Sequence, residues 1–178
     1  QKTLGATTGW LGYTLARSDR RFPDGSINRG DWFPFKYDRR HDISLVVNHR
    51  FSPRIDVSGS WKFYTGGVTT LTTREFATLA PSGYVSSADY VSSRGNYRLP
   101  SSHTLNLGVN FHKQKRRGER IWNISLYNAY NSMNPDFVYK QYKAEYEEGT
   151  YIPRREGVEV VKITVLPILP SFSYTRKF

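Results

Sequence analysis

The chain of 178 residues contains no cysteine, so it can form neither a disulfide framework nor a thiolate metal site. It has no stretch that approaches the roughly 20 apolar residues of a membrane-spanning helix. It begins at Gln1 without a start Met or a signal segment, and we therefore expect a processed product or a piece of a longer protein. These features exclude stapled secreted modules, zinc ribbons and helical membrane proteins.

Aromatic residues, in contrast, are abundant. The 13 Tyr, 10 Phe and 4 Trp make up 15% of the chain, while hydrophobic residues of all kinds reach only 38%. A transmembrane β-barrel has apolar residues at alternate strand positions only, and it concentrates aromatic residues at its two membrane interfaces. The composition is therefore compatible with such a barrel. A soluble β-sandwich with an aromatic core is the alternative.

The formal net charge is +11, which by itself suggests nucleic acid as a partner. The distribution of the charge argues against that partner, because the positive residues lie mostly in the connections between predicted strands. These clusters are Arg17 to Arg21, Arg39-Arg40, Lys113 to Arg120 and Arg154-Arg155.

Period-two alternation predicts six strands. The clearest covers residues 103–112, where Leu105, Leu107, Val109 and Phe111 alternate with polar residues. The predicted ranges are 10–17, 42–51, 55–65, 103–112, 122–139 and 158–178. Pro167 and Pro170 interrupt the last range, and prolines inside a strand imply a bulge, a kink or a break in the pairing.

The predicted connections alternate between long and short. Residues 22–40, 66–100 and 140–156 are long connections, whereas 52–54 and 113–120 are short. Outer-membrane barrels have short periplasmic turns and longer external loops. The pattern therefore predicts an all-β antiparallel transmembrane barrel segment with its C-terminus on the periplasmic side.

The chain ends in an alternating strand that is predicted to place Phe172, Tyr174 and Phe178 on one face. Six strands are too few to close a membrane barrel, since the smallest have about 8. We therefore expect further strands from an N-terminal portion outside this chain to complete the wall.

Several blocks, taken in order, resemble the C-terminal barrel of TonB-dependent outer-membrane receptors of the Bacteroidetes type. They are Tyr37 to Asp42, Asn96 to Pro100, Leu105 to Phe111, Leu126 to Pro135 and Leu166 to Tyr174. The resemblance spans nearly all of residues 1–178. It implies the last six strands of a barrel of about 22 strands, with the plug domain and the N-terminal strands absent from this chain.

The same resemblance implies a function and partners. The function is TonB-dependent uptake of a scarce nutrient across the outer membrane, with gated import and no chemistry on the cargo. The implied partners are outer-membrane lipid and lipopolysaccharide, the remaining strands and plug of the same receptor, TonB through that plug, and the barrel-assembly machinery, which would read Phe172, Tyr174 and Phe178. A surface lipoprotein is a further candidate partner, and nucleic acid is not expected.

No catalytic pattern is present, so we expect no enzyme activity, no cofactor and no metal. The four histidines, His41, His49, His103 and His112, are dispersed, and neither His49 nor His112 has an evident acid or nucleophile at a useful spacing. The acidic loop with Glu145, Glu147 and Glu148 is interpreted as solvated rather than as a calcium site.

Two loop features are singled out as structural or ligand-binding. The charged segment Tyr37 to Asp42 is predicted to fix a loop to the strand mouth through buried ion pairs. The ligand-binding candidates are loop aromatics that could stack on a cargo molecule: Trp32, Tyr84, Tyr90, Tyr97 and Tyr142.

Two other functions stay open. The chain could supply wall strands to another barrel, or be a client of barrel assembly. It could also be a soluble basic β-protein that binds glycan or nucleic acid.

The alternation makes a prediction about adjacent residues. Leu107→Arg should impair membrane assembly far more than Asn106→Arg, because an arginine on the lipid face costs about 2 to 4 kcal/mol near the midplane. Assembly would be measured as the folded fraction in membranes. Equal tolerance at both positions would contradict the proposed register.

Overall fold

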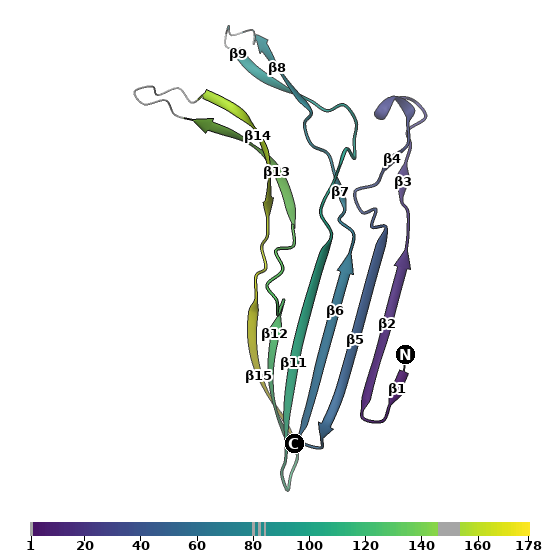
Figure 1. The fold of residues 1–178 in the computed structure, drawn as a ribbon, viewed down its shortest axis with the longest axis vertical. Helices are drawn as coiled ribbons and strands as arrows, with labels where there is room; N and C mark the ends of the chain where they lie inside the picture. Colours follow the sequence, from purple (N-terminus) through teal and green to yellow (C-terminus); the bar gives the residue numbers. More distant parts are fainter. Residues whose placement is uncertain (1, 80, 82, 84, 146–153) are drawn as a thin grey trace.

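The computed structural model describes residues 2–79, 81, 83, 85–145 and 154–178. In this part the chain is all-β, with one 3₁₀ turn, η1 (Asn28–Gly30), and no helix long and apolar enough to cross a membrane. One antiparallel sheet of seven strands forms its body (Figure 1). In spatial order the strands are β1 (Lys2–Leu4), β2 (Thr7–Leu15), β5 (His41–Ser52), β6 (Ile55–Tyr64), β11 (Ser102–Gln114), β12 (Glu119–Tyr127) and β15 (Leu169–Lys177).

The six long strands of this sheet lie where alternation predicted strands. β5, β6 and β11 match the predicted ranges to within two residues at each end. The short strand β1 was not predicted, and it pairs with the start of β2 through the turn at Gly5. The sheet is open, with β1 and β15 as its two edges.

Two predicted strand ranges were wrong in extent. The fifth was expected to continue from residue 122 to 139, but β12 ends at Tyr127 because Asn128 and Asn131 have positive φ angles of 51° and 53°, which a strand cannot contain. The sixth is divided at residues 164–168. Its first half, β14 (Arg154–Ile163), pairs with β13 (Phe137–Glu145) outside the main sheet.

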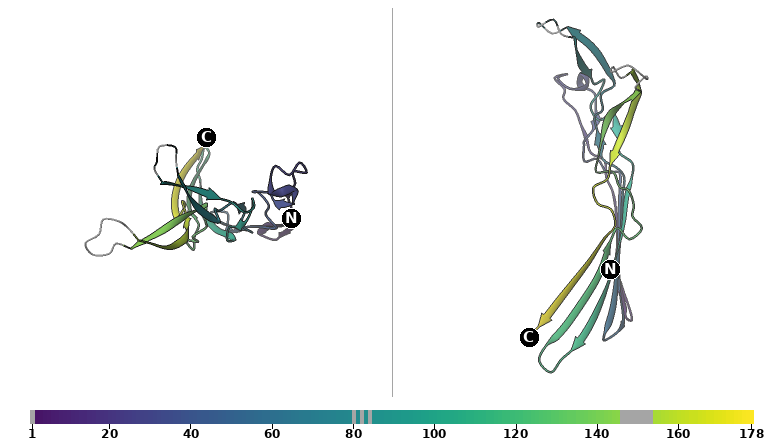
Figure 2. Two further views of the ribbon diagram at one scale, coloured as in Figure 1. Left: turned by 90° about the horizontal axis from the view of Figure 1, so that it is seen from above. Right: turned by 90° about the vertical axis from the view of Figure 1, so that its left-hand side faces the viewer.

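The alternation of long and short connections is confirmed. The tight turns at residues 5–6, 53–54 and 115–118 lie at one end of the sheet, with the C-terminus, and the long connections extend from the other end (Figures 1 and 2). Gly118 is required in the last turn, because its φ is +90° and an added Cβ would lie 1.9 Å from the Lys177 carbonyl oxygen.

The long connections contain small two-stranded sheets. β3 pairs with β4, β7 with β10, β8 with β9, and β13 with β14. Their bounds are β3 (Asp19–Arg20), β4 (Phe33–Pro34), β7 (Val68–Thr69), β8 (Arg74–Leu79), β9 (Val85–Tyr90) and β10 (Tyr97–Arg98).

The main sheet has one face of apolar side chains, which we call the apolar face. Directly paired residues in an antiparallel sheet point to the same side, so the register shows its rows. One row is Val47, Gly59, Leu107 and Leu126, and the next is His49, Val57, Val109, Ile124 and Phe172. Further rows add Leu11, Leu45, Trp61 and Leu105, then Tyr13, Ile43 and Phe63, and, toward the turns, Ile55, Phe111, Trp122 and Tyr174.

The opposite face, the polar face, consists mainly of small hydroxyl and amide side chains. Its central row is Thr8, Asn48, Ser58, Gly108, Ser125 and Ser171. Trp10, Val46, Ile121 and Leu169 are apolar exceptions on this side. The two faces thus differ sharply in polarity across most of the sheet.

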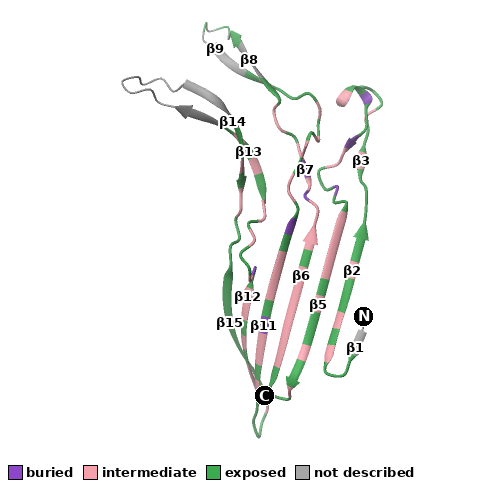
Figure 3. Cartoon of the chain, in the orientation of Figure 1, coloured by how far each residue is buried: buried purple, intermediate pink, exposed green. Residues whose placement is uncertain are grey.

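Most of the apolar face is left uncovered by the described part of the chain (Figure 3). Tyr130 reaches its loop end, where the Trp61 ring nitrogen donates a hydrogen bond to the Tyr130 hydroxyl (3.1 Å). Leu11 is 68% exposed, Ile124 54% and Phe172 62%. The buried hydrophobic side chains among the described residues are Phe33 and Val68, and both lie in the long connections, not in the sheet. A folded monomer in water normally hides such a surface, so this face requires an apolar neighbour.

A buried asparagine turn fastens the end of β12 to its neighbours. The Asn128 side chain accepts a hydrogen bond from the Ser132 amide (2.8 Å) and donates to the carbonyls of Ser132 (3.0 Å) and Leu166 (3.3 Å). Its own amide donates to the Asn106 side chain on β11 (3.0 Å). Asn106→Arg would break this last bond, so it is not a neutral control for Leu107→Arg.

Replacement of Asn128 separates the two roles of this residue. Asn128→Gly keeps the left-handed backbone but loses the side-chain hydrogen bonds, and should lower the free energy of unfolding by about 1 to 3 kcal/mol. Asn128→Ala should cost about 1 kcal/mol more, because alanine is strained at positive φ. Denaturant titration of the two variants would measure both effects. Two variants as stable as the wild type would show that the turn does not hold the strands.

Candidate functional site

A buried carboxylate lies where the long connections meet the sheet. Asp38 is 1% exposed, and its side chain accepts hydrogen bonds from the Arg98 guanidinium (2.5 Å) and from the Ser18 amide (2.8 Å). Arg40 is 4.0 Å away and half-exposed. The predicted ion pair at this strand mouth is therefore present, and it joins the first long connection to the second.

Arg98 also holds the backbone of both connections. Its guanidinium donates to the carbonyl oxygens of Asp38 (2.8 Å) and Gly66 (2.9 Å). Gly66 passes so close to Leu99 that an added Cβ would lie 1.9 Å from the Leu99 carbonyl oxygen, so a side chain does not fit there. These contacts make the loop base a rigid platform.

Burial by itself raises the pKa of Asp38. The hydrogen bonds from Arg98 and Ser18, together with the positive charges of Arg98 and Arg40, outweigh burial and hold this pKa below its usual range. Asp38 is therefore ionised at neutral pH.

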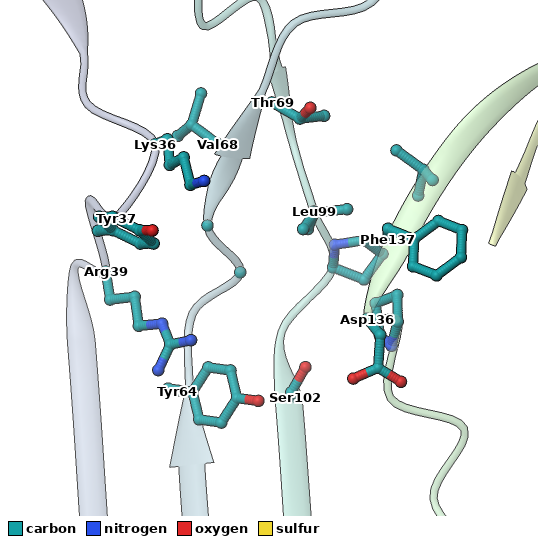
Figure 4. A pocket seen from close by; sticks show the side chains of 15 residues that line it. Lys36, Tyr37, Arg39, Tyr64, Val68, Thr69, Leu99, Ser102, Asp136 and Phe137 are labelled. Atoms are coloured by element: carbon teal, nitrogen blue, oxygen red, sulfur yellow. The ribbon is translucent and has the colours of Figure 1, made fainter. Parts of the chain in front are cut away.

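A cavity of about 340 Å³ opens beside this platform, at the loop end of the polar face. Tyr64 and Ser102, which are paired across β6 and β11, form its floor, and Lys36 and Arg39 line it from the first connection (Figure 4). The Arg39 guanidinium lies over the Tyr64 ring, 4.0 Å from its centre. Asp136 lines the opposite side.

The lining of this cavity suits binding better than catalysis. Two cations, the hydroxyls of Tyr37, Tyr64 and Ser102, and one carboxylate can hold a hydroxylated or anionic small molecule. None of the described histidines lines the cavity, and no nucleophile with an adjacent base is among its lining residues. Lys36 and Arg39 were not predicted as ligand-binding residues. The available signal was the charged segment Tyr37 to Asp42, which contains Arg39 and directly follows Lys36.

The predicted aromatic ligand-binding residues are not gathered around this cavity. Trp32 is 66% exposed before β4, and Tyr90 packs edge-on against Phe76 at the end of β9. Tyr97 is half-buried in β10, paired with Thr69. Tyr142 belongs to β13, and Tyr84 lies outside the described residues. Among them, Tyr90 lines a different hollow of about 620 Å³, with Asn28 and Arg94.

The statement that His112 has no acid beside it was wrong. Its ring nitrogens contact Asp56 of β6 and Glu119 of β12, the latter at 2.8 Å. Asp56 also accepts from Asn110 (2.8 Å), and Glu119 accepts from Lys177 of β15 (3.2 Å). This network ties four strands together at the turn end of the polar face, and no hydroxyl nucleophile of the described residues joins it.

The other histidines have tyrosine or threonine partners. His41 lies 2.9 Å from the Tyr13 hydroxyl, His49 2.7 Å from the Thr7 hydroxyl and His103 2.7 Å from the Tyr130 hydroxyl. In the described part of the chain no group of three or more His, Asp or Glu side chains could hold a metal ion. Glu147 and Glu148 of the acidic loop lie outside that part.

Of the three residues predicted as an assembly signal, Phe172 and Tyr174 lie on the apolar face of β15, and Phe178 directly follows the end of that strand. Trp122 of β12 packs against Phe172 and Tyr174, with ring centres 5.6 Å and 4.5 Å apart. Phe178 is 92% exposed, and the Arg176 guanidinium lies 4.5 Å from its ring centre.

The buried Asp38 pair predicts a pH dependence. Because the pKa of Asp38 is lowered on folding, its stabilisation is complete above the unfolded value of about 3.9 and disappears as pH falls through the folded value. Asp38→Asn should lower the opening free energy of the loop base by about 1 to 3 kcal/mol at neutral pH. In this variant the opening free energy should no longer fall as the pH drops below about 4. Hydrogen exchange at the Ser18 amide would measure both. Asp19→Asn, which removes the pair with the exposed Arg17 side chain, should change this opening free energy by less than about 1 kcal/mol. Equal effects at both sites would contradict a structural role for the Asp38 pair.

Comparisons of the chain with protein-family models, with curated proteins and with solved structures find no match.

Proposed function

We propose that this chain forms the C-terminal part of the wall of a TonB-dependent receptor in the bacterial outer membrane, which takes up a scarce nutrient by binding and gated passage. The observation that carries the proposal is the uncovered apolar face, which lies in register across six long strands and opposite a polar face. Lipid would be the neighbour of the first face, and the interior of a barrel would contain the second.

Strand length and direction support the same function. A transmembrane strand needs about 9 to 11 residues, and the six long strands have between 9 and 13. All tight turns lie at one end of the sheet and all long connections at the other. In an outer-membrane barrel the tight turns face the periplasm, which puts the C-terminus there.

The open edges of the sheet call for additional strands. In lipid each unpaired backbone group costs several kcal/mol, so both edges would have to be paired within the protein. We propose that other strands of the same receptor pair with β15 and with the β1 edge, and that a plug carries the contact with TonB. Phe172 and Tyr174 on the outer face of β15, together with Phe178 directly after it, would be read by the barrel-assembly machinery.

The cavity at Arg39 and Tyr64 is the proposed cargo contact. It lies at the loop end of the polar face, where the long connections meet the sheet. A molecule entering from outside would first reach the barrel interior there. Its cations and hydroxyls favour an anionic or hydroxylated cargo, held without covalent chemistry.

The coding sequence upstream of Gln1 would test the transport proposal. A plug domain encoded directly before this chain would support it. A complete reading frame that begins near Gln1 would favour a separate wall or assembly component instead.

The membrane register can be tested at a cleaner pair of neighbours than Leu107 and Asn106. Val47 lies on the apolar face, whereas Asn48 lies on the polar face, is exposed and makes no side-chain hydrogen bond to any other described residue. Val47→Arg should destabilise the folded, membrane-inserted state by about 2 to 4 kcal/mol and so reduce the folded fraction. Asn48→Arg should destabilise it by much less. The shift in migration between unheated and heated samples on a gel would measure the folded fraction. Equal loss in the two variants would contradict the proposal.

The core of a soluble β-sandwich would also be damaged by Val47→Arg, so extraction is measured on the wild type. A barrel wall should leave membranes only with detergent and should show heat-modifiable migration. Release by high salt or alkaline carbonate, without detergent, would favour the soluble alternative.

A further inference from the structure

A row of three cations crosses the apolar face at its turn end. Lys113 on β11 pairs directly with Arg120 on β12, and Arg120 pairs with Arg176 on β15. The next row toward the sheet centre is the aromatic one, Phe111, Trp122 and Tyr174. We call Lys113, Arg120 and Arg176 the basic row.

The described residues do not neutralise the basic row. Like charges that are directly opposite in a sheet destabilise it, because their Cβ atoms are only about 5 Å apart. No carboxylate in the described part of the chain forms an ion pair with Lys113, Arg120 or Arg176. Glu119, the nearest acidic residue along the chain, belongs to the other face, where it pairs with His112 and Lys177.

The position of the row identifies the chemistry of its missing partner. It follows apolar and aromatic rows on the same face, and that order matches the hydrocarbon, interface and headgroup layers of a bilayer. Arginine and lysine stems can lie along the apolar surface while their charged ends reach the headgroups. A hollow of about 680 Å³ beside Arg120 and Arg176 is lined by further residues of the turn, mostly cations such as Arg116 and Arg117, and by one carboxylate, Glu119.

We propose that the basic row binds the headgroups of anionic phospholipids in the leaflet that faces the tight turns. The inference rests on the proposed membrane function, and it adds a lipid preference at one end of the wall. Phosphate oxygens would accept from the guanidinium groups of Arg120 and Arg176 and from the Lys113 ammonium group. The bound lipids would supply the negative charge that the chain lacks at this row.

Two native tryptophans allow a direct test. Trp122 lies in the row next to the basic row, whereas Trp61 lies on the apolar face nearer the long connections. Each sample contains the whole protein with a single tryptophan, either Trp61 or Trp122, in vesicles of phosphatidylcholine and phosphatidylglycerol. One of the two lipids carries bromine, which quenches a neighbouring tryptophan.

The expected result is selective quenching at Trp122. Brominated phosphatidylglycerol should associate at least about fivefold more strongly than brominated phosphatidylcholine, the equivalent of one cation near an anionic surface. Trp61 should show no such preference. The preference at Trp122 should disappear at about 1 M salt, where the Debye length is about 3 Å.

Substitution of the row provides the matched comparison. Lys113→Gln, Arg120→Gln and Arg176→Gln together should abolish the preference while leaving quenching by brominated phosphatidylcholine unchanged. The same change at Lys115, Arg116 and Arg117, which lie in the turn beyond the paired rows, should leave at least half of the preference.

The outcomes separate the inference from the proposed function. Equal quenching of Trp122 by the two lipids in the wild type would overturn the inference alone. No quenching by either lipid would overturn the membrane function as well. The wild-type salt dependence decides the question even if the triple variant fails to fold.

Discussion

The pairing of β6 with β11 is the constraint on which the rest of the structure depends. Ten residue pairs in unbroken register, from Ser102 with Tyr64 to Phe111 with Ile55, place every side chain of the sheet centre on one face or the other. A shift by one residue would exchange the faces, because side chains alternate with a period of two. The same register brings Asp56 beside His112 at one end, and Tyr64 beside Ser102 under the cavity at the other.

Two polar side chains, Asp38 and Asn128, are buried and hydrogen-bonded where the chain leaves the sheet. Asp38 with Arg98 fastens the first and second long connections, and Asn128 fastens the third. Both groups of side-chain hydrogen bonds lie where the regular backbone pairing of the strands stops. A buried Asp38 or Asn128 side chain without these partners would be costly. Rigid loop bases of this kind allow the outer parts of the connections to vary without disturbing the wall.

Much of the fold followed from sequence because a half-buried or lipid-facing strand has a strong local signal. Leu105 to Phe111 alternates without exception, and the short turns are marked by Pro53 and Gly118. The end of β12 was missed because Leu126 to Tyr130 keeps a strand-like composition, while the left-handed turn at Asn128 depends on partners in β11 and near Leu166. The partners of His112 were missed because they depend on the register of β11 with β6 and β12. The residues of one strand do not reveal that register. The five aromatic candidates were chosen by residue type alone, which says nothing about where loops converge.

The two edges of the sheet have a consequence for any wall built from it. β1 and β15 run in the same direction, since the strands between them alternate. If the wall closes with every neighbouring pair antiparallel, additional strands must bridge these two edges. The first and the last of these additional strands must both run opposite to β1 and β15. Their number must then be odd. Any proposed companion segment can be judged by this parity alone, before its sequence or its cargo is considered.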